Sequence, residues 1–128
     1  MSYKIVIADD EVHIRLLLEQ TLEELTDTYD MQILTASDGD EALSLILAEK
    51  PHLVFLDIMM PKKDGFTVCQ TVTRTPECKD TQILLLTAKG QTSDHERGTA
   101  VGAIDYLTKP FDPDYIVSIT KELLGLKG

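Results

Sequence analysis

The chain has 128 residues, of which 43% are hydrophobic, and its formal net charge is −10 at pH 7. This length suits one compact domain with a hydrophobic core of its own, so we expect residues 1–128 to form a single domain. The acidic charge disfavours direct binding to nucleic acid or to anionic membranes, because both recruit proteins mainly through Lys and Arg.

Five short apolar runs recur along the chain, and each is rich in aliphatic or β-branched residues. Such runs are typical of strands that are buried on both faces of a parallel sheet. They cover residues 4–8 (KIVIA), 31–36 (MQILTA), 53–56 (LVFL), 83–86 (ILLL) and 103–107 (AIDYL). We therefore predict five strands, with the first one beginning close to the N-terminus.

Apolar residues with helical spacing fill the intervals between these strands. They are Ile14, Leu17, Leu18, Thr21 and Leu25, then Ala42, Leu43, Ile46 and Leu47, then Phe66, Cys69 and Val72, and finally Ile116, Ile119 and Leu123. Asp112 before Pro113 is a helix start signal, and Asp38 with Glu41 three residues later resembles a capping box. Residues 92–101 are largely polar and include a glycine, so any helix there is expected to be marginal.

The predicted strands and helices alternate five times along the chain. Right-handed crossovers then give a parallel sheet that is covered by helices on both faces, which is a doubly wound α/β fold. No apolar run approaches the about 20 residues of a membrane-spanning helix, and the N-terminus lacks a secretory apolar region. We expect a cytoplasmic protein in which Cys69 and Cys78, with eight residues between them, are buried free thiols.

Polar side chains follow the strands at the edge of the sheet where doubly wound proteins bind their ligands. They are Asp9, Asp10 and Glu11 after the first strand, Asp57 after the third, Thr87 after the fourth, and Thr108 and Lys109 after the fifth. Crowded carboxylates repel one another, so either a proton or a cation must neutralise them. Oxygen ligands favour a hard cation, and the absence of an EF-hand loop favours Mg²⁺ over Ca²⁺.

Each of these residues also has an ordinary structural interpretation. An acidic pair after a strand often caps the next helix, a threonine is a common strand residue, and most lysines are simply exposed. Asp57 is poorly placed for capping, because Pro61 and Gly65 postpone the next helix. A functional site is favoured because three aspartates, a hydroxyl group and an ammonium group fall at one edge of the sheet. These five residues are Asp9, Asp10, Asp57, Thr87 and Lys109.

Four segments of the chain resemble the signature segments of response-regulator receiver domains from bacterial two-component systems. The segments are IADDE, LVFLDIMMPKKDGF, LLLTAKG and GAIDYLTKPFDP, and they occur in the family's order at similar spacing. The resemblance covers nearly the whole chain and implies the flavodoxin-like strand order 2-1-3-4-5. It also implies a signalling domain that catalyses only its own phosphorylation and dephosphorylation, not an enzyme with other substrates.

The resemblance implies a role for each acidic residue of the predicted site. Asp57 would accept a phosphoryl group from the phosphohistidine of a sensor histidine kinase or a phosphotransfer domain. Mg²⁺ would be bound by Asp57, Asp10 and Asp9, the last directly or through water, and by the carbonyl oxygen of Met59. Met59 and Lys89, which flank the site, would tune the dephosphorylation rate.

The resemblance also implies a switch. The Thr87 hydroxyl would bind the phosphoryl group, and Lys109 would pair with its oxygens or, beforehand, with the acceptor carboxylate. Tyr106 would then turn inward, and residues 92–101 with the last strand and helix would signal to a downstream output domain or protein. Dimerisation on phosphorylation stays open, and the Lys109–Pro110 bond is expected to be cis.

Three other interpretations compete with this one. A flavin-binding flavodoxin needs a phosphate loop rich in glycine and hydroxyl groups after the first strand, where this chain has ADDEVH. A haloacid-dehalogenase-type phosphatase carries a second Asp two positions after its nucleophile, where this chain has Met59. A degenerate receiver that acts only as a binding module is disfavoured by the intact set of five residues.

Overall fold

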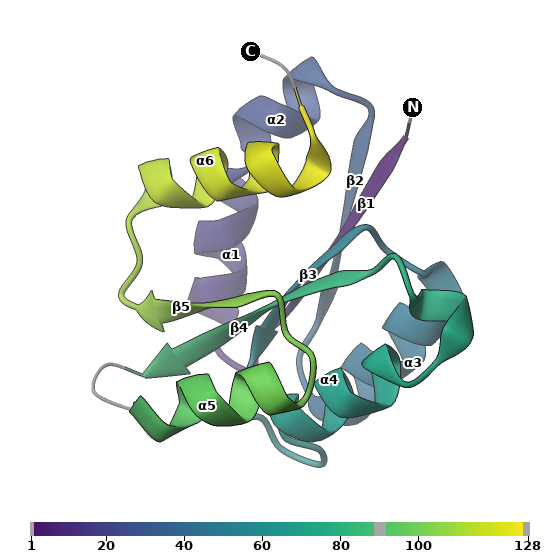
Figure 1. Cartoon of the computed structure of the whole chain (residues 1–128). Coiled ribbons are helices and arrows are strands. Elements are labelled where there is room, and N and C mark those ends of the chain that lie inside the picture. The colour runs from purple at the N-terminus through teal and green to yellow at the C-terminus, as the bar shows by residue number, and fades with distance from the viewer. Residues whose placement is uncertain (1, 89–91, 127–128) are drawn as a thin grey trace.

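A computed structural model describes residues 2–88 and 92–126. Its centre is one sheet of five parallel strands in the order β2-β1-β3-β4-β5 (Figure 1). The strands are β1 (Tyr3–Ala8), β2 (Met31–Ala36), β3 (Leu53–Asp57), β4 (Gln82–Ala88) and β5 (Asp105–Lys109). The predicted doubly wound α/β fold and its strand order are therefore confirmed.

Helices cover both faces of this sheet (Figure 1). They are α1 (Val12–Thr21), α2 (Glu23–Thr28), α3 (Gly39–Glu49), α4 (Gly65–Thr73), α5 (Thr92–Ala100) and α6 (Pro113–Leu124), and a short 3₁₀ turn spans Pro76–Cys78. Helices α1, α2 and α6 lie on one face, while α3, α4 and α5 lie on the other. None of the described helices is long and apolar enough to cross a membrane.

Alternate residues of the strands feed two apolar layers, one on each face of the sheet. In β1, Ile5 and Ile7 pack with α1, α2 and α6, whereas Val6 and Ala8 pack with α3 and α4. All five residues of β3 are buried, as expected for the central strand of a doubly wound sheet. The free thiols of both cysteines are buried, as predicted.

The predicted helix start signals are confirmed. The Asp38 carboxylate accepts a hydrogen bond from the Glu41 amide at 2.8 Å, and the Glu41 carboxylate accepts one from the Ser37 amide at 2.7 Å. Asp112 caps α6 by accepting from the Asp114 amide at 3.0 Å. These side chains satisfy amide groups that the first turn of a helix leaves without partners.

Several predicted elements differ from the structure in their bounds, and β1, β3 and β4 extend one or two residues beyond the predicted runs. The single helical stretch expected after β1 is divided at Leu22 into α1 and α2. The fifth strand begins two residues later than predicted, because the amide of Ala103 closes the end of α5 by donating to the Gly98 carbonyl at 3.0 Å. The strand also ends two residues later than predicted, at Lys109, and the bond from Lys109 to Pro110 is cis, as expected.

The helix predicted to be marginal is present as α5, and its glycine has a packing role. A Cβ atom at Gly98 would lie 2.8 Å from Cδ1 of Leu85 in β4, so a larger residue would force the Leu85 side chain to move, and glycine lets the helix lie close to the sheet. The Arg97 guanidinium also lies 4.3 Å from the centre of the Phe66 ring in α4. Close packing on β4 and α4 thus offsets the low helix propensity of the segment.

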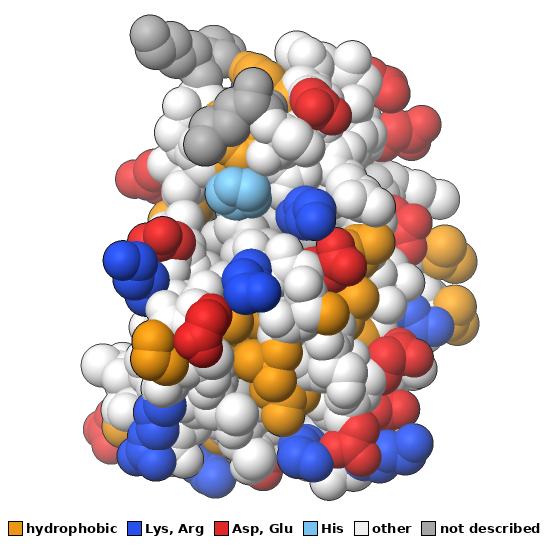
Figure 2. All heavy atoms as spheres, turned by 90° about the vertical axis from the view of Figure 1, so that its right-hand side faces the viewer, with side chains coloured by type: hydrophobic (Ala, Val, Ile, Leu, Met, Phe, Trp, Pro, Cys, Tyr) orange, Lys and Arg blue, Asp and Glu red, His pale blue; other side chains and the backbone are white. Residues whose placement is uncertain are grey.

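Charges of both signs are interspersed on the side of the molecule where the strands begin. Figure 2 shows this side, with hydrophobic side chains exposed between basic and acidic ones. Lys4, near the start of β1, pairs with Glu49, the last residue of α3, at 2.9 Å. The negative net charge of the chain is therefore not concentrated on this side.

Candidate functional site

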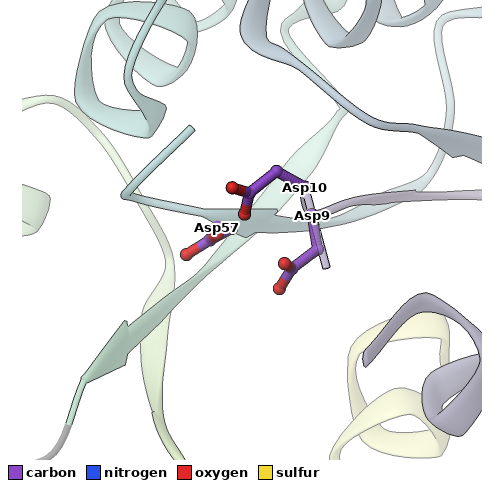
Figure 3. A group of neighbouring side chains, drawn as sticks. All are labelled: Asp9, Asp10 and Asp57. Carbon is purple, nitrogen blue, oxygen red and sulfur yellow. The ribbon is translucent and has the colours of Figure 1, made fainter. Parts of the chain in front are cut away.

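Three carboxylates meet at the carboxyl edge of the sheet. Asp9 and Asp10 directly follow β1, and Asp57 is the last residue of the neighbouring strand β3. One carboxylate oxygen from each of the three lies within 4.8 Å of the others (Figure 3). The register of β1 against β3, in which Ala8 pairs with Leu56, produces this proximity.

The ammonium group of Lys109 lies among these carboxylates. Its Nζ is 2.8 Å from Asp9 Oδ2, 3.4 Å from Asp57 Oδ1 and 3.6 Å from Glu11 Oε1. The expected pairing of Lys109 with Asp57 is present, and the ammonium group lies closer still to Asp9. The lysine therefore compensates several acidic groups at once, including Glu11, for which the sequence had predicted no role.

Asp9 is held in place by two further contacts. Its Oδ1 accepts a hydrogen bond from the Glu11 amide at 2.9 Å, and its backbone carbonyl accepts one from Nη1 of Arg15 at 2.6 Å. Arg15 was not identified from the sequence, because nothing in a helical repeat indicates that an arginine turns back toward the preceding strand. The buried Asp9 is thus a fixed part of the site.

The positive charge of Lys109 does not fully compensate the negative charge of an ionised Asp57. Burial, followed by the negative charge of Asp9, raises the pKa of Asp57 from its ordinary value of 3.8 to about 7, against the opposing effects of Lys109 and the Met59 amide. Burial alone would lower the pKa of Lys109, but its hydrogen bond to Asp9 and the surrounding negative charges raise it overall. The cluster is therefore suited to binding either a proton or a cation near neutral pH.

The arrangement fits a hard divalent cation. A cleft of about 290 Å³ lies over the carboxylates and is lined by Asp10, Glu11, Asp57, Met59 and Lys109. The Met59 side chain is 75% exposed at its rim, and the Met59 amide donates to Asp57 Oδ1 at 3.3 Å. All the acidic ligands are oxygens and the cleft is open to water, which suits Mg²⁺ better than a soft metal.

The hydroxyl group of Thr87 is notable for its burial and its hydrogen bonding. Thr87 is 2% exposed, and its Oγ1 has no hydrogen-bond partner among the residues that the structure describes. Burying a hydroxyl without a partner costs free energy, so this atom is suited to a ligand that supplies an acceptor. Thr87 follows Leu86, which pairs with Asp57 in the sheet.

The structure does not bring every predicted residue to the cleft. Tyr106 is 37% exposed on β5 and borders a separate cavity of about 70 Å³, which Gly98, Thr99 and Ile104 also line. The tyrosine thus lies beside α5, where a switch residue was expected. Lys89 lies outside the described residues.

Gly65 fixes the loop that follows Asp57. Its amide donates to the Ile58 carbonyl at 2.8 Å, and a Cβ atom there would lie 2.4 Å from the backbone oxygen of Asp57. We expect Gly65→Ala to lower the free energy of unfolding by about 2–4 kcal/mol in urea titrations, because the added methyl group would clash with backbone atoms, which move less readily than the end of a side chain.

Gly125→Ala is the matched control for this substitution. A Cβ atom at Gly125 would meet nothing within 4 Å, although the residue has a φ of +67°. Its expected cost is about 1 kcal/mol, from the left-handed conformation alone. If both variants lost the same stability, the close approach at Gly65 would not control the loop.

Proteins of known family resemble this chain closely. A family model described as the response regulator receiver domain matches residues 5–121. PhoP of Bacillus subtilis, named as the alkaline phosphatase synthesis transcriptional regulatory protein, is 43% identical over 124 residues, which are 97% of this chain and 49% of PhoP. RpaA of Synechocystis, named as a DNA-binding dual master transcriptional regulator, is 42% identical over 94% of this chain and 48% of its own length.

A solved structure agrees with these sequence relatives. The BeF3-activated receiver domain of DrrB, a Thermotoga maritima protein, superimposes with a TM-score of 0.85 at 30% identity, over 98% of this chain and 99% of that domain. The chain spans about half the length of the curated relatives that it matches. It belongs to the family of response regulator receiver domains of two-component signalling.

Proposed function

We propose that this receiver domain accepts a phosphoryl group on Asp57 with the assistance of Mg²⁺. The observation that carries the proposal is the cluster of three carboxylate oxygens within 4.8 Å of one another, with the Lys109 ammonium 3.4 Å from Asp57 Oδ1. Thr87, whose hydroxyl has no partner among the described residues, stands at the same edge of the sheet, one position after the strand partner of Asp57. Such a cluster supplies a nucleophile, ligands for a cation and groups that bind an anion.

The acceptor carboxylate has a clear chemical task in this proposal. An Asp57 oxygen attacks the phosphorus of a phosphohistidine, so that an O–P bond forms while the N–P bond to the imidazole breaks. Both reactants are anionic, and the repulsion between them must be cancelled by fixed positive charge. Lys109 supplies one such charge, 3.4 Å from Asp57 Oδ1.

Mg²⁺, when bound by Asp9, Asp10, Asp57 and the Met59 carbonyl, would supply the remaining positive charge. Asp9 would contribute directly or through a water molecule, since its Oδ2 already accepts from Lys109. The raised pKa of Asp57 favours this assignment, because a cation keeps the acceptor ionised and nucleophilic at neutral pH.

The Thr87 hydroxyl would donate a hydrogen bond to the incoming phosphoryl group. This bond would draw the side chain toward Asp57, and Tyr106 would follow by turning inward beside α5. The surface formed by α5, β5 and α6 would then signal to an output domain or partner. Because PhoP and RpaA are named transcriptional regulators, we infer that this output controls transcription, with a sensor histidine kinase or phosphotransfer domain as the donor.

The test is the intact mass of the protein after incubation with acetyl phosphate, with and without Mg²⁺. We expect the wild type to gain one phosphoryl group only with Mg²⁺, and Asp57→Asn to gain none. A gain in both proteins would assign the phosphoryl group to another residue. If the wild type neither gained mass nor bound BeF3 with Mg²⁺ in ¹⁹F NMR spectra, it would be a degenerate receiver that acts as a binding module.

A further inference from the structure

Arg15 makes a contact with the acidic site that the proposed function does not use. This residue lies in the first turns of α1 and is half-buried. Its Nη1 donates to the backbone carbonyl of Asp9 at 2.6 Å. A bond from a charged donor at this distance is among the stronger hydrogen bonds in proteins.

The carbonyl that Arg15 binds belongs to the peptide group between two of the acidic residues. The Asp9 carbonyl and the Asp10 amide share one rigid plane, so a bond that orients this plane also orients the side chains on either side of it. Figure 3 shows the two aspartates leaving the chain at this point, near Asp57. The direction of both carboxylates thus depends on the orientation of one peptide group.

The other hydrogen bonds of this turn do not involve the carbonyl oxygen of Asp9. The Asp9 amide donates to the Ala36 carbonyl at 3.1 Å, and Asp9 Oδ1 accepts from the Glu11 amide at 2.9 Å. Glu11 is the N-cap residue of α1, but its side chain makes no capping hydrogen bond. The hydrogen bond from Arg15 therefore restrains the Asp9 carbonyl group, which these other hydrogen bonds do not.

We propose that Arg15 is a positioning residue, which presets the Asp9–Asp10 peptide so that both carboxylates meet Asp57 at the spacing a divalent cation requires. The inference rests on the proposed function. Arg15 acts through the backbone and would touch neither the cation nor the phosphoryl group. Removing a residue that orients the ligands of a metal typically changes the affinity for that metal strongly.

The test compares Arg15→Met, Arg15→Lys and the control Arg74→Met in Mg²⁺ titrations by calorimetry, at a temperature where circular dichroism shows all variants fully folded. Arg74 is exposed just after α4, and its removal changes the net charge equally. We expect Mg²⁺ affinity to fall about tenfold in Arg15→Met. Arg15→Lys, which can still donate to the carbonyl, should remain within about threefold of the wild type.

A second measurement separates positioning from a general structural role. At saturating Mg²⁺ the maximal rate of phosphorylation by acetyl phosphate should be retained in Arg15→Met, while the Mg²⁺ concentration for half-maximal rate rises. The inference is overturned if Arg15→Met binds Mg²⁺ as tightly as Arg74→Met, or if Arg15→Lys is as weak as Arg15→Met. Absence of Mg²⁺ binding in the wild type would instead overturn the proposed function as well.

Discussion

Replacing Lys109 with methionine is expected to lower the free energy of unfolding of the metal-free protein by about 3 kcal/mol near neutral pH. The reason is that Lys109 lies within 4 Å of three acidic residues and is largely buried, so its removal leaves their charges uncompensated. Mg²⁺ affinity should rise at the same time, since a competing positive charge has left the site. Urea unfolding with a chelator and with Mg²⁺ measures both effects.

Lys63→Met is the matched control for this prediction. Lys63 pairs with Asp40 at the surface, where both side chains are 40% or more exposed. Its loss is expected to cost less than about 1 kcal/mol, because water and salt screen exposed ion pairs. Equal losses in the two variants, or weaker Mg²⁺ binding in Lys109→Met, would contradict the role given to Lys109.

The residues of the site could be predicted because each stands at a strand end, and strand ends are visible in the sequence. Asp57 follows the run LVFL, and the structure places it at the end of β3. Parallel strands carry their carboxyl ends to one edge, so the sequence pattern was enough to bring Asp9, Asp10 and Lys109 together. The strand order, in contrast, came only from the resemblance to the family.

Contacts that depend on tertiary distances could not be predicted in this way. Helical spacing does not show that Arg15 turns back to a backbone carbonyl, or that Lys109 lies closer to Asp9 than to Asp57. Gly98 was predicted to weaken its helix, because propensity counts only the local cost. Its close approach to Leu85 became visible once the helix was placed on the sheet.

Asp57→Asn is expected to stabilise the metal-free protein by about 2 kcal/mol at about pH 8. Asp57 has its pKa raised from 3.8 to about 7 in the folded protein, so folding favours the protonated carboxyl. In the wild type, protonated Asp57 contributes to the free energy of unfolding in full below about pH 4, and this contribution is lost as the pH rises through about 7. Asparagine does not titrate. The difference in the free energy of unfolding between Asp57→Asn and the wild type should therefore grow over this range of pH and then stay constant.

Unfolding titrations in a chelator at several pH values test this prediction, with Asp40→Asn as the control for an exposed carboxylate. The control should change the stability by less than about 0.5 kcal/mol. Adding Mg²⁺ should stabilise the wild type more than Asp57→Asn and so shrink the advantage of the variant, because the cation removes the repulsion that penalised the ionised carboxylate. If Asp57→Asn were instead the less stable protein without metal at about pH 8, the attraction between Asp57 and Lys109 would outweigh burial and the charge of Asp9.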